Sequence, residues 1–169
     1  PVKVENALHH AMHYEQVTIS RQTIDNLINS QGKIIAVGTT SMRSLESLYW
    51  FGVQLLKNPE AGFTITQHDP YTLPDLLPAS EALGAVRAYL DLRKIDTLSG
   101  TTSIFIYPGY TFKICQGLIT NFHQPGSTLM LLVAAFIGKD WKEVYSQALL
   151  QGYRFLSYGD SSLLLPGRG

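Results

Sequence analysis

Two polar loops carry the residue types that chemistry would need. The first, Gly38-Thr39-Thr40-Ser41-Met42-Arg43, follows the apolar run KIIAV and precedes apolar residues at helical spacing. A helix that begins after a strand offers free N–H groups and partial positive charge to an anion, and an arginine suits a carboxylate or phosphate. Capping by Ser41 and a surface arginine would explain the same residues equally well. The loop lacks the glycines and lysine of a phosphate-binding P-loop, so spacing alone leaves both readings open.

The second loop, residues 121–128 (NFHQPGST), also lies between a strand pattern and a helix pattern. Catalytic groups often occupy such loops, because a rigid scaffold positions them. His123 could donate or accept a proton near neutral pH. Taken alone, the pattern slightly favours a histidine that is hydrogen-bonded to backbone in a tight loop.

A third segment, residues 153–160 (YRFLSYGD), interleaves aromatic side chains with Arg154 and Asp160. Such a segment could stack a base or hold a ribose. It could equally be an aromatic core strand in which Arg154 and Asp160 form an ion pair.

The histidines near the start of the chain do not predict a metal site. His9, His10 and His13 lack an organised third ligand, and Glu15 alternates with His13 on a predicted strand. Zinc needs three or four organised ligands with an outer shell. A polar cluster at the surface or facing a substrate is the better expectation.

Alternating and β-branched runs predict the strands that would position these loops. They are Tyr14–Ser20, Lys33–Gly38, Thr102–Tyr107, Phe112–Thr120 and, at the end, Leu163–Leu165. The Lys33–Gly38 run is typical of a buried parallel strand. The pattern predicts an α/β fold, a three-layer α/β/α sandwich with a mostly parallel sheet.

Apolar spacing predicts five helices between the strands. The first is capped by Ser20 and ended by Gly32, and the second follows Ser41 and breaks at Gly52. The third is capped by Ser80. The fourth runs from Ser127 or Thr128 to Gly138, and the fifth covers Trp141–Leu150.

The length of 169 residues favours a single α/β domain. Asn58–Pro78 contains four prolines and weak periodicity, so we expect it to lie outside the core, within an insertion over residues 58–100. Pro1 is not an initiator methionine, and Pro1–Glu5 reads as extended chain, which favours the C-terminal part of a longer enzyme.

Composition limits the classes of partner. The 13 basic and 13 acidic side chains cancel, so there is no electrostatic footprint for nucleic acid. One cysteine excludes an internal disulfide and fits a reducing cytoplasm. The longest apolar run, Leu129–Ile137, is about half of the roughly 20 residues that cross a bilayer, and the N-terminus lacks the zones of a signal peptide.

Four segments, in order, resemble the S-adenosylmethionine:tRNA ribosyltransferase-isomerase family of queuosine biosynthesis. They are HAMHYE (10–15), IIAVGTTSMRSLES (34–47), TSIFIYPGYTF with LITNFHQPGSTLMLLVAAFIG (102–112 and 118–138), and YRFLSYGD (153–160). Any one of them is weak, whereas four in the family's order are strong.

The resemblance implies transfer and isomerisation of the ribosyl part of S-adenosylmethionine onto an aminomethyl-deazaguanine base in the tRNA anticodon. The products would be epoxyqueuosine, adenine and methionine. It implies no metal and no tightly held cofactor, since S-adenosylmethionine is a co-substrate. The partners would be tRNA, S-adenosylmethionine and a missing N-terminal half of the same chain, with no membrane and a cytoplasmic location.

The resemblance also implies which residues belong to the site. The catalytic candidates are His123, Asn121 and Asp160, with His123 assigned to proton transfer. The candidates for substrate binding are Gly38, Thr39, Thr40, Ser41, Arg43, His13, Glu15, Arg154 and Tyr158.

The sequence departs from the family pattern in places. Gln124-Pro125-Gly126 stands where leucine-proline-lysine is usual, an acidic residue is missing near Cys115, and Asn58–Gly100 is longer than usual. These departures suggest a divergent paralogue. They leave open a non-catalytic tRNA- or nucleotide-binding module, or a transferase with a different acceptor.

Overall fold

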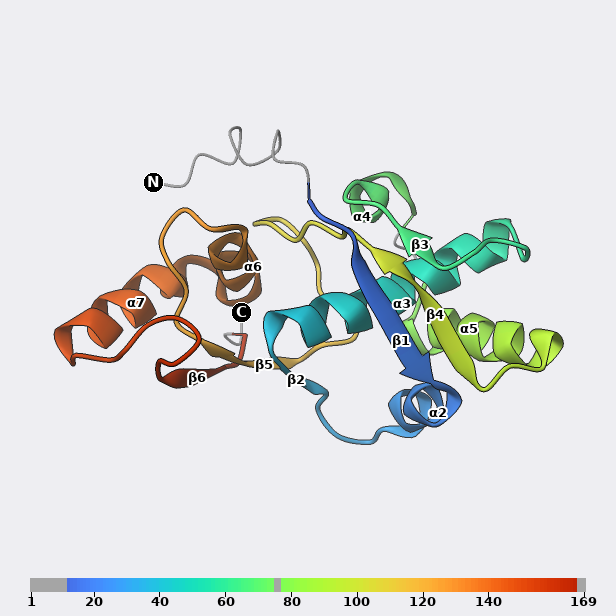
Figure 1. Cartoon of the computed structure of the whole chain (residues 1–169), viewed down its shortest axis with the longest axis horizontal. Helices are drawn as coiled ribbons and strands as arrows, with labels where there is room; N and C mark the ends of the chain where they lie inside the picture. The colour runs from blue at the N-terminus through green and yellow to red at the C-terminus, as the bar shows by residue number, and fades with distance from the viewer. Residues whose placement is uncertain (1–11, 75–76, 167–169) are drawn as a thin grey trace.

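The computed structural model describes residues 12–74 and 77–166, which form an α/β structure (Figure 1). Its strands are β1 (Glu15–Ser20), β2 (Ile35–Val37), β3 (Thr64–Ile65), β4 (Thr97–Thr102), β5 (Gly117–Asn121) and β6 (Ser161–Leu164). Its helices are α2 (Arg21–Asn29), α3 (Thr39–Lys57), α4 (Asp69–Thr72), α5 (Ala79–Arg93), α6 (Thr128–Ile137), the 3₁₀ helix η1 (Gly138–Asp140) and α7 (Trp141–Leu150).

The strands form two small mixed sheets, ordered β1-β4-β3 and β2-β5-β6. In the first, β4 pairs antiparallel with β1 and parallel with β3. In the second, β5 pairs parallel with β2 and antiparallel with β6. The predicted α/β class is confirmed, whereas a three-layer sandwich on one mostly parallel sheet is not. Helix α3 runs through the centre of the molecule and contacts strands of both sheets (Figure 1).

Several predicted elements are present, and their caps explain where they begin. The Ser20 side chain accepts a hydrogen bond from the backbone N–H of Thr23 at 3.1 Å and so caps α2. Ser127 does the same for α6 by accepting from the N–H of Met130 at 3.2 Å. Gly138, at φ 61°, ends α6 as predicted.

Three helix boundaries differ from the predictions. Helix α3 does not break at Gly52 but continues to Lys57, because the glycine lies against the backbone of Ala82 in α5 and a Cβ there would lie 2.2 Å from the Ala82 carbonyl oxygen. Ser80 lies inside α5, which begins after Pro78. Helix α2 ends at Asn29 with Ser30, not Gly32, as its C-cap.

Two predicted strands are displaced along the chain. Strand β4 ends at Thr102, where the predicted strand begins, and the buried residues Ile104–Ile106 continue beyond the ladder. Strand β5 begins only at Gly117. The preceding residues Lys113–Cys115 direct their N–H groups to a buried carboxylate instead of a neighbouring strand.

Two residues of the proline-rich segment, Phe63 and Ile65, are part of the core, so the expectation that Asn58–Pro78 lies outside the core is wrong for them. Phe63 and Ile65 are buried, and Ile65 pairs with Thr102 of β4. The fit is close, because a Cβ on Gly100 would lie 2.1 Å from the Phe63 carbonyl oxygen. The wider insertion over residues 58–100 stays a prediction.

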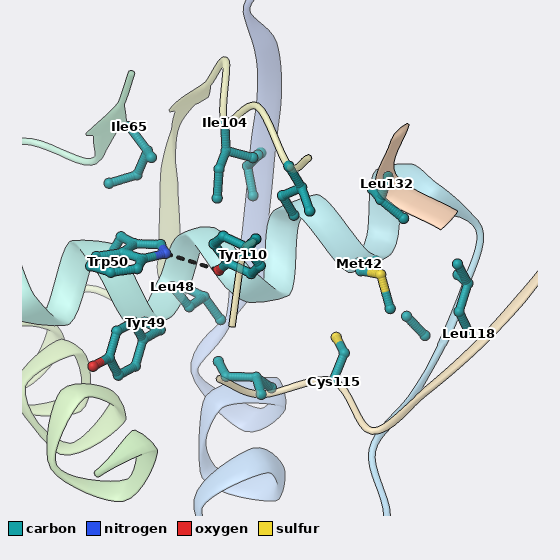
Figure 2. Packing of buried hydrophobic residues seen from close by; sticks show 14 of the residues in the cluster. Met42, Leu48, Tyr49, Trp50, Ile65, Ile104, Tyr110, Cys115, Leu118 and Leu132 are labelled. Carbon is teal, nitrogen blue, oxygen red and sulfur yellow. Dashed lines mark hydrogen bonds between the residues drawn. The ribbon is translucent and has the colours of Figure 1, made fainter. Parts of the chain in front are cut away.

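Helix α3 supplies much of the core. Met42, Leu48, Tyr49 and Trp50 are almost fully buried, and Figure 2 shows them facing side chains from both sheets and from the 104–115 segment. Burial of each large apolar side chain contributes about 1.5–3 kcal/mol. The core therefore fixes α3 relative to the loops around it.

The sheet β2-β5-β6 has one buried and one open face. Ala36, Leu118 and Leu164 lie on the buried face. On the opposite face, Val37 aligns with Ile119 and Ile119 with Leu163. Val37 is 66% exposed and Leu163 is 56% exposed, so the prediction of a buried strand at 33–38 holds only for one side of it.

Candidate active site

The first predicted loop is the first turn of α3. Gly38, at φ 88°, is the N-cap, and its N–H donates to the Ile119 carbonyl of β5 at 2.8 Å. Among the described residues no side chain caps this helix, so Ser41 does not have the capping role that was one of the two readings of this loop. Thr39 is buried, whereas Thr40 and Ser41 are exposed. The helix therefore presents its positive N-terminal end beside the carboxyl ends of two parallel strands, β2 and β5.

Arg43 is not a surface arginine. It is 6% exposed, and its Nη1 donates to Oε1 of Glu15 at 2.8 Å, which joins α3 to β1. Within the described residues, Nε and Nη2 of Arg43 and Oε2 of Glu15 are buried without a hydrogen-bond partner. Burial lowers the pKa of Arg43, and the Glu15 carboxylate opposes that shift. A buried polar atom without a partner costs about 1–3 kcal/mol, and more when it is charged.

A small cavity of about 10 Å³, the size of one water molecule, adjoins Arg43. It is lined by Met12, Arg43, Ile104, Phe105, Ile106, Thr128, Leu129 and Leu132. Four segments therefore line it: the chain just before β1, α3, the chain beyond β4, and the N-terminal half of α6. Its walls are apolar except for the arginine and Thr128.

His123 lies on the loop between β5 and α6 and is half-buried. Its Nε2 is 2.9 Å from Oγ1 of Thr120, and its backbone N–H donates to the Tyr145 hydroxyl at 3.1 Å. Burial lowers the pKa of His123, so the ring is mostly neutral at pH 7. The structure thus gives the predicted proton carrier a fixed position and a neutral imidazole.

The other two catalytic candidates are Asn121, the last residue of β5, and Asp160, in the turn that follows α7. The Asn121 amide donates to the Gly159 carbonyl at 3.2 Å. Asp160 accepts from the Arg154 backbone N–H at 2.7 Å and from its guanidinium at 3.1 Å. The Arg154 side chain holds the pKa of Asp160 below its ordinary value. The ion pair weighed from sequence is present, although the segment is an exposed turn and not a core strand.

The remaining predicted residues are open to solvent. Tyr158 is 96% exposed, and His13 is exposed at the start of β1. Among residues 12–74 and 77–166, no three His, Cys, Asp or Glu side chains gather as metal ligands. His9 and His10 lie outside the described residues.

Sequence analysis missed Glu46, a fully buried carboxylate on α3. It accepts from the Tyr110 hydroxyl at 2.8 Å and from three backbone N–H groups at 2.8–3.0 Å. The Trp50 indole donates to the same Tyr110 oxygen at 2.9 Å, as Figure 2 shows. Burial raises the pKa of Glu46, and the four donors oppose that shift. Glu46 therefore fixes the 110–115 loop to α3. No local signal in the sequence indicates that this glutamate is buried.

Within the described residues, no helix has the length and apolar character needed to cross a membrane.

Comparison with known proteins gives the same family as the motifs. The profile of the family described as "Queuosine biosynthesis protein" matches residues 1–164. S-adenosylmethionine:tRNA ribosyltransferase-isomerases of Novosphingobium aromaticivorans and Rhizorhabdus wittichii are 42% and 39% identical over 170 and 171 residues. Those alignments cover 98% and 99% of this chain but 38% of each relative.

A solved structure is also similar to this chain. The S-adenosylmethionine tRNA ribosyltransferase of Thermotoga maritima is 32% identical to this chain, with a TM-score of 0.58, over 89% of this chain and 40% of that one. By sequence and by structure, the chain belongs to the queuosine biosynthesis protein family.

Proposed function

We propose that this chain supplies part of the active site of an S-adenosylmethionine:tRNA ribosyltransferase-isomerase. The observation that carries the proposal is the 42% identity over 98% of the chain to a relative of that name. In this reaction the ribosyl part of S-adenosylmethionine is transferred and isomerised onto an aminomethyl-deazaguanine base of tRNA, and adenine and methionine are released. A tRNA substrate would place the reaction in the cytoplasm.

The site supports the proposal through two features. The uncapped N-terminus of α3 and the buried Arg43 favour an anionic group beside β2 and β5. The neutral His123 could accept the proton from the carbon next to the sulfonium, or help adenine to leave. Asn121 and Asp160 hold the 154–160 turn beside that loop, and we assign them to positioning.

We further propose that the active enzyme needs the part of the family polypeptide that this chain does not match. Relatives are more than twice as long, since the aligned region is 38% of their length. In α/β proteins parallel strands are normally covered on both faces. The open face of β2-β5-β6, with Val37 and Leu163 exposed, is therefore the expected contact for that additional part. The three-layer α/β/α sandwich predicted from the sequence would require another layer over this face of the sheet.

Adenine release and nucleoside mass analysis test the function. The complete polypeptide receives S-adenosylmethionine and tRNA that carries the aminomethyl-deazaguanine base. Stoichiometric adenine and the epoxycyclopentyl product are expected. Tight tRNA binding without adenine would reject the enzyme in favour of a binding module. Adenine release with a different acceptor would support a ribosyl transferase but reject the aminomethyl-deazaguanine base as its acceptor.

A further inference from the structure

A groove of about 310 Å³ lies along α7, at the end of the molecule away from α5 (Figure 1). Two of its lining side chains are aromatic: Phe122, from the loop after β5, and Tyr153, which follows α7. Three are polar and spaced four residues apart along α7 and its C-cap: Glu143, Gln147 and Gln151. Aromatic rings together with hydrogen-bonding groups fit a flat heterocycle, which is apolar on its faces and polar at its edge.

The charges of the groove limit the class of ligand. Among the described residues that line it, none is a lysine or arginine, so a phosphate would find no counter-charge there. The one charged lining group is the Glu143 carboxylate, which accepts hydrogen bonds. The Gln147 amide donates one N–H to Glu143 Oε1 at 2.9 Å and has a second N–H. The pair therefore presents a donor next to two carboxylate oxygens.

Guanine has the matching edge. Its O6 accepts, and its N1–H and 2-amino group are adjacent donors. Adenine, cytosine and uracil lack two adjacent donors on this edge, so each would place an acceptor against the carboxylate. A 7-deazaguanine keeps the guanine edge, because it differs from guanine only at position 7. Its substituent at position 7 lies on the other side of the ring system and stays clear of the glutamate.

We propose that this groove binds the aminomethyl-deazaguanine base of tRNA, with the Glu143 carboxylate accepting from N1–H and the 2-amino group. Gln147 donates to O6, and the ring lies against the aromatic side chains. The groove adjoins the loop of the predicted proton carrier, since Tyr145 of α7 accepts from the His123 backbone N–H at 3.1 Å. This inference rests on the proposed function, which supplies the base, and it makes Glu143 the residue that selects the acceptor.

The 2-amino group of the base provides the test. The complete polypeptide receives tRNA with the aminomethyl-deazaguanine base or with a base that lacks only the 2-amino group, and kcat/KM is measured by adenine release. The unsubstituted enzyme should use the second tRNA about 10- to 100-fold less well, the range for one charge-assisted hydrogen bond. Glu143→Gln should lose about 10-fold or more with the normal base, because an amide N–H would face the 2-amino group. It should lose less than about 3-fold with the other base, because glutamine keeps one oxygen for N1–H.

Two further variants separate recognition of the edge from other effects. Glu81→Gln is the matched control, because Glu81 is also an exposed glutamate in the first turn of a helix, α5. It should change neither rate. Tyr153→Ala should weaken both tRNAs alike, by about 10-fold, since stacking does not depend on the 2-amino group. An equal loss for the two bases in Glu143→Gln would overturn the assignment, because it would indicate a structural role or a contact with another part of the tRNA.

The unsubstituted enzyme distinguishes this inference from the proposed function. Adenine release at equal rates with the two bases would retain the function and reject the groove as the base site. If no adenine is released, competition between the two tRNAs for binding decides. Tighter binding of the normal tRNA that Glu143→Gln abolishes would retain the groove and reject the reaction, and equal binding would reject both.

Discussion

The Glu46 carboxylate and the Tyr110 hydroxyl lie 2.8 Å apart although 64 residues separate them in sequence. Tyr110 also accepts from Trp50 at 2.9 Å, so one phenolic oxygen joins the centre of α3 to the loop at 110–115. The same carboxylate binds the N–H groups of Lys113, Ile114 and Cys115. This loop leads directly into β5, and the loop that follows β5 carries His123.

Glu46→Gln should destabilise the protein by about 3 kcal/mol or more, because an amide nitrogen would face N–H donors and leave them unpaired in the interior. Tyr110→Phe removes one hydroxyl and should cost about 1–2 kcal/mol. Chemical denaturation of the purified chain measures both. Glu143→Gln, on the exposed side of α7, is the control and should be within about 0.5 kcal/mol of the unsubstituted chain. An equally small loss for Glu46→Gln would contradict the assigned role.

The pH dependence of activity should report His123. Burial lowers its pKa from the ordinary value of 6.5, so the neutral base persists to more acidic pH than a solvent-exposed histidine would allow. We expect the acid limb of the pH profile of kcat to lie below 6.5 in the complete enzyme. His123→Asn should reduce kcat by about 10²-fold or more and remove that limb. The control His68→Asn, at an exposed position, should leave the profile unchanged.

The same shift has a consequence for stability. The unfolded chain takes up the histidine proton at a higher pH than the folded chain does. The stability that His123 contributes is therefore present above about pH 6.5 and is lost as the pH falls through its folded pKa. Thermal melts of the unsubstituted chain and His123→Asn should diverge most at neutral pH and converge in acid.

Gly52→Ala should destabilise the protein by about 2 kcal/mol, although alanine is the better helix former. The new methyl group would lie 2.2 Å from the Ala82 carbonyl oxygen unless α5 moves away. Gly84→Ala is a matched control in α5, since a Cβ there meets nothing within 4 Å. It should raise stability by about 0.5–1 kcal/mol. Equal effects of the two substitutions would show that the helices are not in the described contact.

Val37→Lys tests the open sheet face. In the 169-residue chain it should reduce binding of an apolar fluorescent dye with little loss of stability, because Val37 is 66% exposed. In the complete polypeptide it should destabilise by about 1–3 kcal/mol, because a charge would be buried. Gln16→Lys, at an exposed position of β1, should neither reduce dye binding by the 169-residue chain nor destabilise the complete polypeptide. The proposal of a cover fails if Val37→Lys is harmless in both forms.

Local signals in the sequence predicted local structure well. Ser20 and Ser127 cap the helices that follow them, because a cap is decided by the next three residues. The family resemblance selected Arg43 and His123 for the site, and that assignment stays a prediction. Long-range contacts could not be predicted in this way. Gly52 looks like a helix breaker until Ala82 lies against it, and Glu46 looks like a surface residue until Tyr110 and the 113–115 amides surround it.

The contact between Gly52 and Ala82 also bears on how this family tolerates changes in length. Helices α3 and α5 pack extensively against each other, and the close approach of Gly52 to Ala82 is part of that contact, so α5 keeps its position whatever connects it to α3. Between Lys57 and β3, the exposed residues 58–60 could change in number without disturbing the core, whereas Phe63 is buried beside Gly100. A change in length at residues 58–60 would therefore leave the contact between α3 and α5 in place.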